Sequence, residues 1–154
     1  MSDERTDFDQ LIPEIRLWND GAGISAEGWI GCVGNYPLAV GYSLIFWPRF
    51  VRFEGYVLRE GFSEGALRGF ESGEGSSRAS VERVMNHLHI GDIHFGEQAA
   101  EAQLRYLGRV LKEIYEVKLR ADFPDLRFVV EFEDEPGLDP VDYQLSFRQA
   151  EEGE

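Results

Sequence analysis

The segment EQAAEAQLRYLGRVLKEIYEVKLRA, residues 97–121, has the clearest helical pattern in this chain. Two apolar rows recur at steps of three or four residues: Ala100, Leu104, Leu107, Leu111, Ile114 and Lys118, flanked by Tyr106, Val110, Val117 and Ala121. A stripe of this width is typical of a helix that faces a core. Glu97 and Glu101 suit the positive end of the helix dipole, and Pro124 ends the helix. We therefore predict a long helix over about 97–121.

Two segments after this helix alternate between apolar and polar residues, as half-buried strands do. The apolar positions are Phe128, Val130 and Phe132 in the first segment and Tyr143, Leu145 and Phe147 in the second. Residues 134–140, rich in Asp, Pro and Gly, have the composition of a turn. The pattern predicts an antiparallel C-terminal β-hairpin with one face on the core, packed on the long helix. A strand near residues 51–58 is expected to extend it into a small sheet.

The preceding half of the chain is read as short helices. Ser25 is a candidate N-cap of a helix that ends at Gly34. Asn35 is a candidate N-cap of a second helix that runs to Phe46. Residues 13–19 fit either a helix or a short strand. The fold class we predict is α+β, a mostly helical single domain with a small antiparallel sheet. We expect a disordered tail over residues 1–6, a single domain over 7–149 and an acidic tail over 150–154.

The formal net charge of −14 is concentrated at the ends of the chain. Residues 122–154 hold eleven acids and two arginines, whereas the acids and bases of residues 21–121 nearly balance. Such a field repels nucleic acid and anionic membranes, so we expect no direct nucleic acid and no membrane among the partners. Cys32 is the only cysteine, and we find neither a signal peptide nor a membrane-length apolar run. We therefore expect a cytoplasmic protein.

The acidic hairpin is the first candidate site. Its carboxylates are Glu131, Glu133, Asp134, Glu135, Asp139 and Asp142, and no basic residue lies between Glu133 and Asp142. One interpretation is a solvated edge that resists aggregation. The other is a docking face for a basic protein partner, with an exposed aromatic such as Trp47 as anchor. On this basis we predict a non-enzymatic acidic interaction module, for example an immunity or inhibitor protein against a nucleic-acid-directed toxin.

The histidines are the second candidate site. The chain's three histidines lie within eight residues and, with one acid, form the set His87, His89, Asp92 and His94. Imidazole and carboxylate ligands suit a divalent transition metal, so the alternative function is a small metal-dependent enzyme. The spacing weakens this hypothesis, because on a helix His87 and His89 would point about 200° apart. In an extended segment these two would share a face, with Asp92 and His94 as a separate pair. Capping of a helix end is the simpler role.

Nine aromatic residues lie between Trp29 and Phe62. We expect most of them in the core and Trp47, before Pro48 at an element junction, to be partly exposed, although such a patch also suits a ligand pocket or an oligomer interface. The sequence contains no Gly-Lys-Ser/Thr loop and no Gly-x-Ser-x-Gly elbow, and the glycines near Gly21 do not fit a dinucleotide fingerprint. We therefore predict no cofactor for the leading hypothesis.

Overall fold

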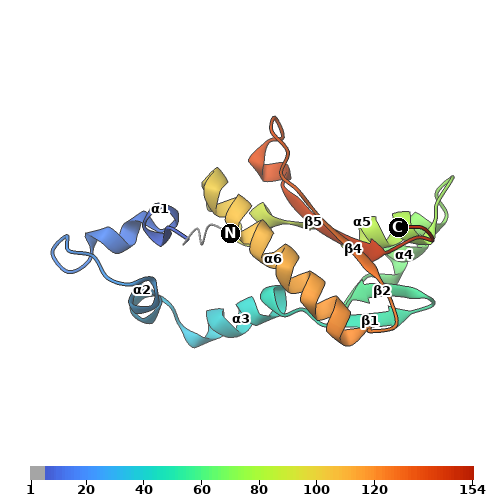
Figure 1. The fold of residues 1–154 in the computed structure, drawn as a ribbon, viewed down its shortest axis with the longest axis horizontal. Coiled ribbons are helices and arrows are strands. Elements are labelled where there is room, and N and C mark those ends of the chain that lie inside the picture. Colours follow the sequence, from blue (N-terminus) through green and yellow to red (C-terminus); the bar gives the residue numbers. More distant parts are fainter. Residues whose placement is uncertain (1–5) are drawn as a thin grey trace. The chain divides into compact units, whose positions relative to one another are not determined.

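A computed structural model describes residues 6–154 and confirms the α+β class (Figure 1). The chain forms two compact units, one that ends at Ser43 and one over Leu44–Glu154. All of the predicted 1–6 tail except Thr6 lies outside the described residues. We expected a single domain over residues 7–149, and with the chain divided into two units this stays a prediction.

The first unit contains short helices and almost no buried side chains. Its elements are α1 (Phe8–Leu11), the 3-10 helix η1 (Pro13–Leu17), α2 (Ala26–Val33) and most of α3 (Tyr36–Phe46). The Ser25 hydroxyl accepts a hydrogen bond from the Gly28 amide and caps α2, as predicted. Residues 13–17 are helical, so the alternative strand is wrong. Among the described residues of this unit, only Ile15 is buried.

The second unit begins with a hairpin where we expected one strand. β1 (Phe50–Phe53) and β2 (Tyr56–Arg59) pair antiparallel in a sheet of their own. Glu54 and Gly55 form the two-residue turn, with φ of 50° and 85°. Positive φ at both positions matches the twist of the flanking strands, and the glycine adopts it without strain. The prediction of a continuous strand missed this turn, because glutamate rarely occupies such a conformation.

Two short helices and a short strand follow the hairpin. α4 (Glu64–Glu71) is capped by Ser63 and α5 (Arg78–Met85) by Ser77. The chain then extends through β3 (Leu88–His89) into the 3-10 helix η2 (Ile90–Asp92). Leu88 therefore lies in a strand and does not continue the helical face of α5.

The remaining elements are the long helix and the C-terminal hairpin. α6 (Glu101–Asp122) begins four residues after the predicted start, and is followed by β4 (Phe128–Glu133), the 3-10 helix η3 (Pro140–Asp142) and β5 (Gln144–Gln149). β4 and β5 pair antiparallel as predicted, with Val130 opposite Phe147. The third strand of this sheet is β3, in the order β3-β5-β4. The expectation that residues 51–58 would extend the sheet is therefore wrong.

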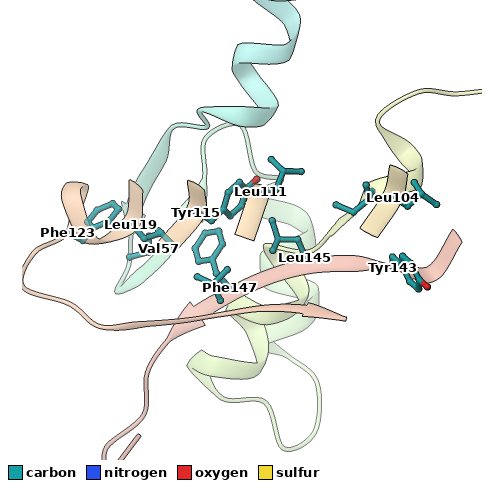
Figure 2. Close-up of a cluster of buried hydrophobic side chains, with 11 residues drawn as sticks. Val57, Leu104, Leu111, Tyr115, Leu119, Phe123, Tyr143, Leu145 and Phe147 are labelled. Atoms are coloured by element: carbon teal, nitrogen blue, oxygen red, sulfur yellow. The ribbon is translucent and has the colours of Figure 1, made fainter. Parts of the chain in front are cut away.

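The core lies between α6 and the C-terminal sheet (Figure 2). The buried face of α6 is formed by Leu104, Gly108, Leu111, Tyr115 and Leu119. The flanking row predicted from sequence is partly wrong, since Val117 is 55% exposed. At Gly108 the helix lies close to β4, since a Cβ at this position would lie 2.1 Å from the Phe132 ring. The absence of a side chain lets β4 approach the helix along this face.

Candidate functional site

The polar face of β4 carries the first two predicted carboxylates. Phe128, Val130 and Phe132 pack against the core, and the side chains of Glu131 and Glu133 are 43% and 25% exposed on the other face. The predicted segregation of apolar and acidic side chains is therefore confirmed, since successive residues of a strand point to opposite faces.

These two carboxylates have a partner within the chain. The Arg83 guanidinium of α5 lies 2.6 Å from Glu133 Oε1 and 3.8 Å from Glu131 Oε2. The amide of Gln144 on β5 donates a second hydrogen bond to Glu133, at 2.7 Å. The hydrogen bond from Gln144 has the largest effect on the pKa of Glu133. Together with the hydrogen bond from Arg83 it lowers this pKa below 4.5, although burial acts in the opposite direction. Glu133 is thus an anion held in place by its own fold.

Asp134 is also paired, with arginines that the local sequence did not reveal. Its carboxylate accepts from Arg105 Nε at 3.1 Å and lies 3.3 Å from Arg109 Nη2. Both arginines stand on α6, four residues apart, and therefore share one face of the helix. Residues 134–142 contain no base, but α6 supplies two beside them.

A cleft of about 630 Å³ lies where η3 meets the start of α6. Its lining includes an apolar part, Leu104, Pro140 and Val141, and three acids, Glu97, Glu101 and Asp139. Of these acids, Glu101 pairs with Arg105 at 3.0 Å and accepts from the Tyr143 hydroxyl at 3.1 Å. Burial, and to a smaller extent the hydrogen bond to Glu101, raises the pKa of Tyr143.

Further acids surround the cleft. Asp139 accepts a hydrogen bond from the Val141 amide, which fixes the loop at its edge. Glu135 and Asp142 are exposed on the same loop. Asp139 and Asp142 were predicted as site residues from the sequence, whereas Glu97 and Glu101 were predicted only as residues at the start of the long helix. The structure brings the two segments together because η2 contacts both η3 and α6.

Trp47, the predicted anchor, lies at the other end of α6. It is 57% exposed, as expected of the residue at this junction. The Lys118 Nζ lies 5.3 Å from the centre of its ring, a cation–π distance. Since Glu101 and Lys118 are 17 residues apart on one helix, they are roughly 25 Å apart along its axis. The structure therefore does not bring Trp47 together with the acidic cleft.

The four residues of the predicted metal site do not form one cluster. His87 Nδ1 lies 2.6 Å from the Val84 carbonyl oxygen at the end of α5, and the ring of His87 packs edge to face on that of His89 at 5.3 Å. Asp92 and His94 lie beyond the turn at Ile90. Over residues 6–154, no three His, Cys, Asp or Glu side chains are grouped closely enough to hold a metal ion.

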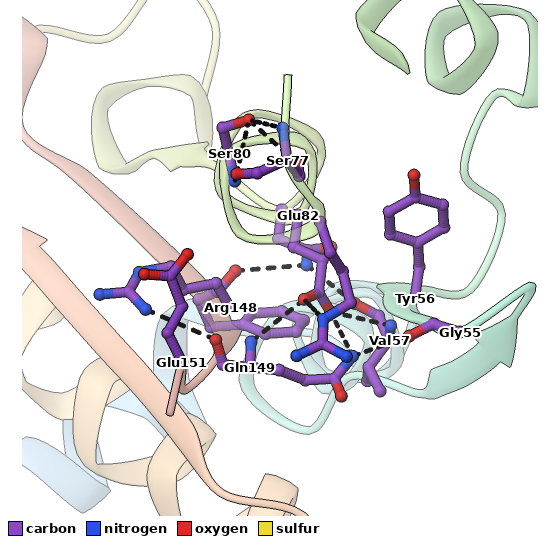
Figure 3. Close-up of polar contacts among 12 residues, drawn as sticks. Gly55, Tyr56, Val57, Ser77, Ser80, Glu82, Arg148, Gln149 and Glu151 are labelled. Atoms are coloured by element: carbon purple, nitrogen blue, oxygen red, sulfur yellow. Dashed lines mark hydrogen bonds and ion pairs between the residues drawn. The ribbon is translucent and has the colours of Figure 1, made fainter. Parts of the chain in front are cut away.

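The structure contains a buried polar network that no sequence pattern indicates (Figure 3). Glu82 on α5 is fully buried, and its carboxylate accepts from the amides of Val57 at 2.9 Å and Gln149 at 3.2 Å. Asn86, one turn later and also fully buried, donates to the carbonyls of Val57 and Phe147. Because these bonds reach both β2 and β5, side chains of one helix join the two sheets. The network stabilises the contact between the two sheets, and none of its residues lines the cleft described above.

The nine aromatic residues from Trp29 to Phe62, which we call the aromatic block, divide between core and surface. Phe50 packs on Tyr115 and Phe147 in the main core, whereas Tyr36 is 88% exposed. Cys32 in α2 is also exposed. The expectation of a core role thus fails for Tyr36, whereas Phe46, at the end of α3, packs against the main core.

No helix within residues 6–154 combines the length and the apolar character that crossing a membrane requires. Comparisons of the chain with protein-family models, with curated proteins and with solved structures gave no match.

Proposed function

We propose that this protein is a non-enzymatic interaction module that binds a basic protein partner through the acidic cleft between η3 and the start of α6. An immunity or inhibitor protein that blocks the basic substrate cleft of a nucleic-acid-directed toxin is the specific form of this proposal. The single exposed cysteine, Cys32, suits a reducing compartment such as the cytoplasm.

The cleft itself is the observation that carries the proposal. It combines an apolar lining with Glu97, Glu101 and Asp139, and Glu135 and Asp142 stand exposed on the adjoining loop. A lysine or arginine side chain suits such a site, since its aliphatic stem packs on apolar atoms while its charged head meets a carboxylate.

The internal ion pairs change which acids we assign to the interface. Arg83 compensates Glu131 and Glu133, and Arg105 and Arg109 compensate Asp134. A basic partner would have to displace these arginines, so the six predicted residues contribute unequally. We assign the main role to Asp139, Asp142 and Glu135, together with Glu97.

The experiment is a titration with a deca-arginine peptide and with basic proteins encoded by neighbouring genes. Reversal of Asp139 and Glu97 to lysine is expected to weaken binding at least about tenfold, since each change removes an attraction and adds a repulsion. The matched control reverses Glu113 and Glu116, which change the net charge equally from the middle of α6. Binding should weaken as salt rises.

Equal losses in the two double variants would mean that the partner senses only net charge, and the cleft would then have no specific role. Affinity that does not change from low salt to several hundred millimolar salt would also exclude the proposal.

A further inference from the structure

The helices α2 and α3 form a segment almost without charge, which we call the apolar arm (Ala26–Phe46). Glu27 is its only charged residue, although 44 of the 154 residues in the chain are charged. α3 has apolar residues on every side and no acidic or basic residue in its first or last turn. A helix that is apolar all round is normally covered on all sides.

The arm leaves large side chains in contact with solvent. The most exposed are Ile30 at 59%, Val33 at 48%, Tyr36 at 88%, Leu38 at 40%, Val40 at 67% and Leu44 at 73%. Together they present on the order of 700 Å² of mainly apolar surface, close to the roughly 800 Å² that each partner contributes to a standard stable interface. Exposed apolar area of this size is typical of an interaction surface.

The charge distribution favours a second copy of this chain as the occupant. Two chains of net charge −14 repel each other wherever their acidic surfaces meet. The arm holds one of the 29 acids, so two copies can approach there with the least repulsion. A basic partner, in contrast, gains nothing from a surface with a single charge.

We propose that the protein is a homodimer in which the apolar arms of two copies pack against each other. The dimer buries the side chains that one chain leaves exposed, and it uses none of the residues that line the acidic cleft. This inference does not depend on the proposed function. The two interfaces also respond to salt in opposite directions: salt screens the repulsion between copies and strengthens the dimer, whereas it weakens binding of a basic partner.

The test is light scattering and sedimentation equilibrium of the full chain over a range of concentrations. The expected mass is twice the 17.6 kDa of one chain. Val40→Glu should raise the dimer dissociation constant by roughly 100-fold or more, because the two-fold interface buries each substituted position twice. Val40→Leu should preserve the dimer.

Val117→Glu is the matched control, since Val117 is 55% exposed on α6, outside the arm. It should leave the mass unchanged, and circular dichroism checks that both glutamate variants fold. A wild-type mass of one chain at every concentration would overturn the proposal. So would a dimer that survives Val40→Glu as well as it survives Val117→Glu, or a dimer that dissociates when salt is added.

Discussion

The apolar arm and the long helix α6 contain similar side chains but bury them very differently. In α3, Val40 is 67% exposed and Leu44 is 73% exposed, whereas Leu111 and Leu119 in α6 are fully buried. The difference lies in the arrangement of polar residues. α6 keeps its charges, except that of the buried Lys118, off its apolar face, so this face packs on a sheet while the other charges stay at the surface. α3 has no charged face and no buried residue, and only Ile45 and Phe46 at its C-terminal end pack against the main core.

Apolar content alone therefore does not make a helix part of a core. The second unit adds what the arm lacks: a glycine that admits a neighbouring strand, and polar groups buried with their partners. Three predictions test whether these features account for the difference.

The largest expected effect comes from Glu82→Ala. This change removes the acceptor of the Val57 and Gln149 amides and leaves two buried donors without partners, so it should lower the free energy of unfolding by about 3–5 kcal/mol. Chemical denaturation measures the loss. Glu27→Ala, on the exposed first turn of α2, is the counterpart in the arm and should change stability by less than about 1 kcal/mol. A loss below about 1 kcal/mol for Glu82→Ala would show that the network does not stabilise the second unit.

The next effect comes from Gly108→Ala. The new Cβ would overlap the Phe132 ring, and we expect a destabilisation of about 1–3 kcal/mol in spite of the better helix propensity of alanine. Adding Phe132→Leu should recover part of the loss in a double-mutant cycle. At Gly41 in α3 a Cβ meets nothing within 4 Å, so Gly41→Ala should not lower stability. Equal outcomes at the two glycines would contradict the close packing of α6 on β4.

The smallest effect concerns pH. Because the folded-state pKa of Glu133 lies below its ordinary value of 4.5, its bonds to Gln144 and Arg83 contribute stability above that value, and the contribution is lost as pH falls through the lowered pKa. The stability difference between wild type and Glu133→Gln should therefore be largest near neutral pH and shrink on acidification. For this partly exposed group it should stay under about 1 kcal/mol. Glu113→Gln serves as the exposed control; a difference for Glu133→Gln that grows towards acid pH would reverse the assigned sign.

The candidate sites were predictable to different degrees. Alternation along residues 128–133 correctly placed Glu131 and Glu133 on the face away from the core, because side-chain direction in a strand follows from position alone. Their pairing with Arg83 joins residues about 50 positions apart, and no local pattern contains that information. The same holds for Glu97 and Asp139, which line one cleft although α6 and β4 separate them in the chain.

The sequence by itself determined the α+β class, the long helix, the C-terminal hairpin and the excess of acids, because periodicity, capping residues and charge are local properties. Tertiary structure decided that β3 completes the C-terminal sheet, that Glu82 and Asn86 join it to the first hairpin, and that arginines neutralise half of the predicted acidic face. It also decided that the aromatic block divides between core and surface. These outcomes depend on which distant segments meet, since burial and pairing are properties of neighbours in space.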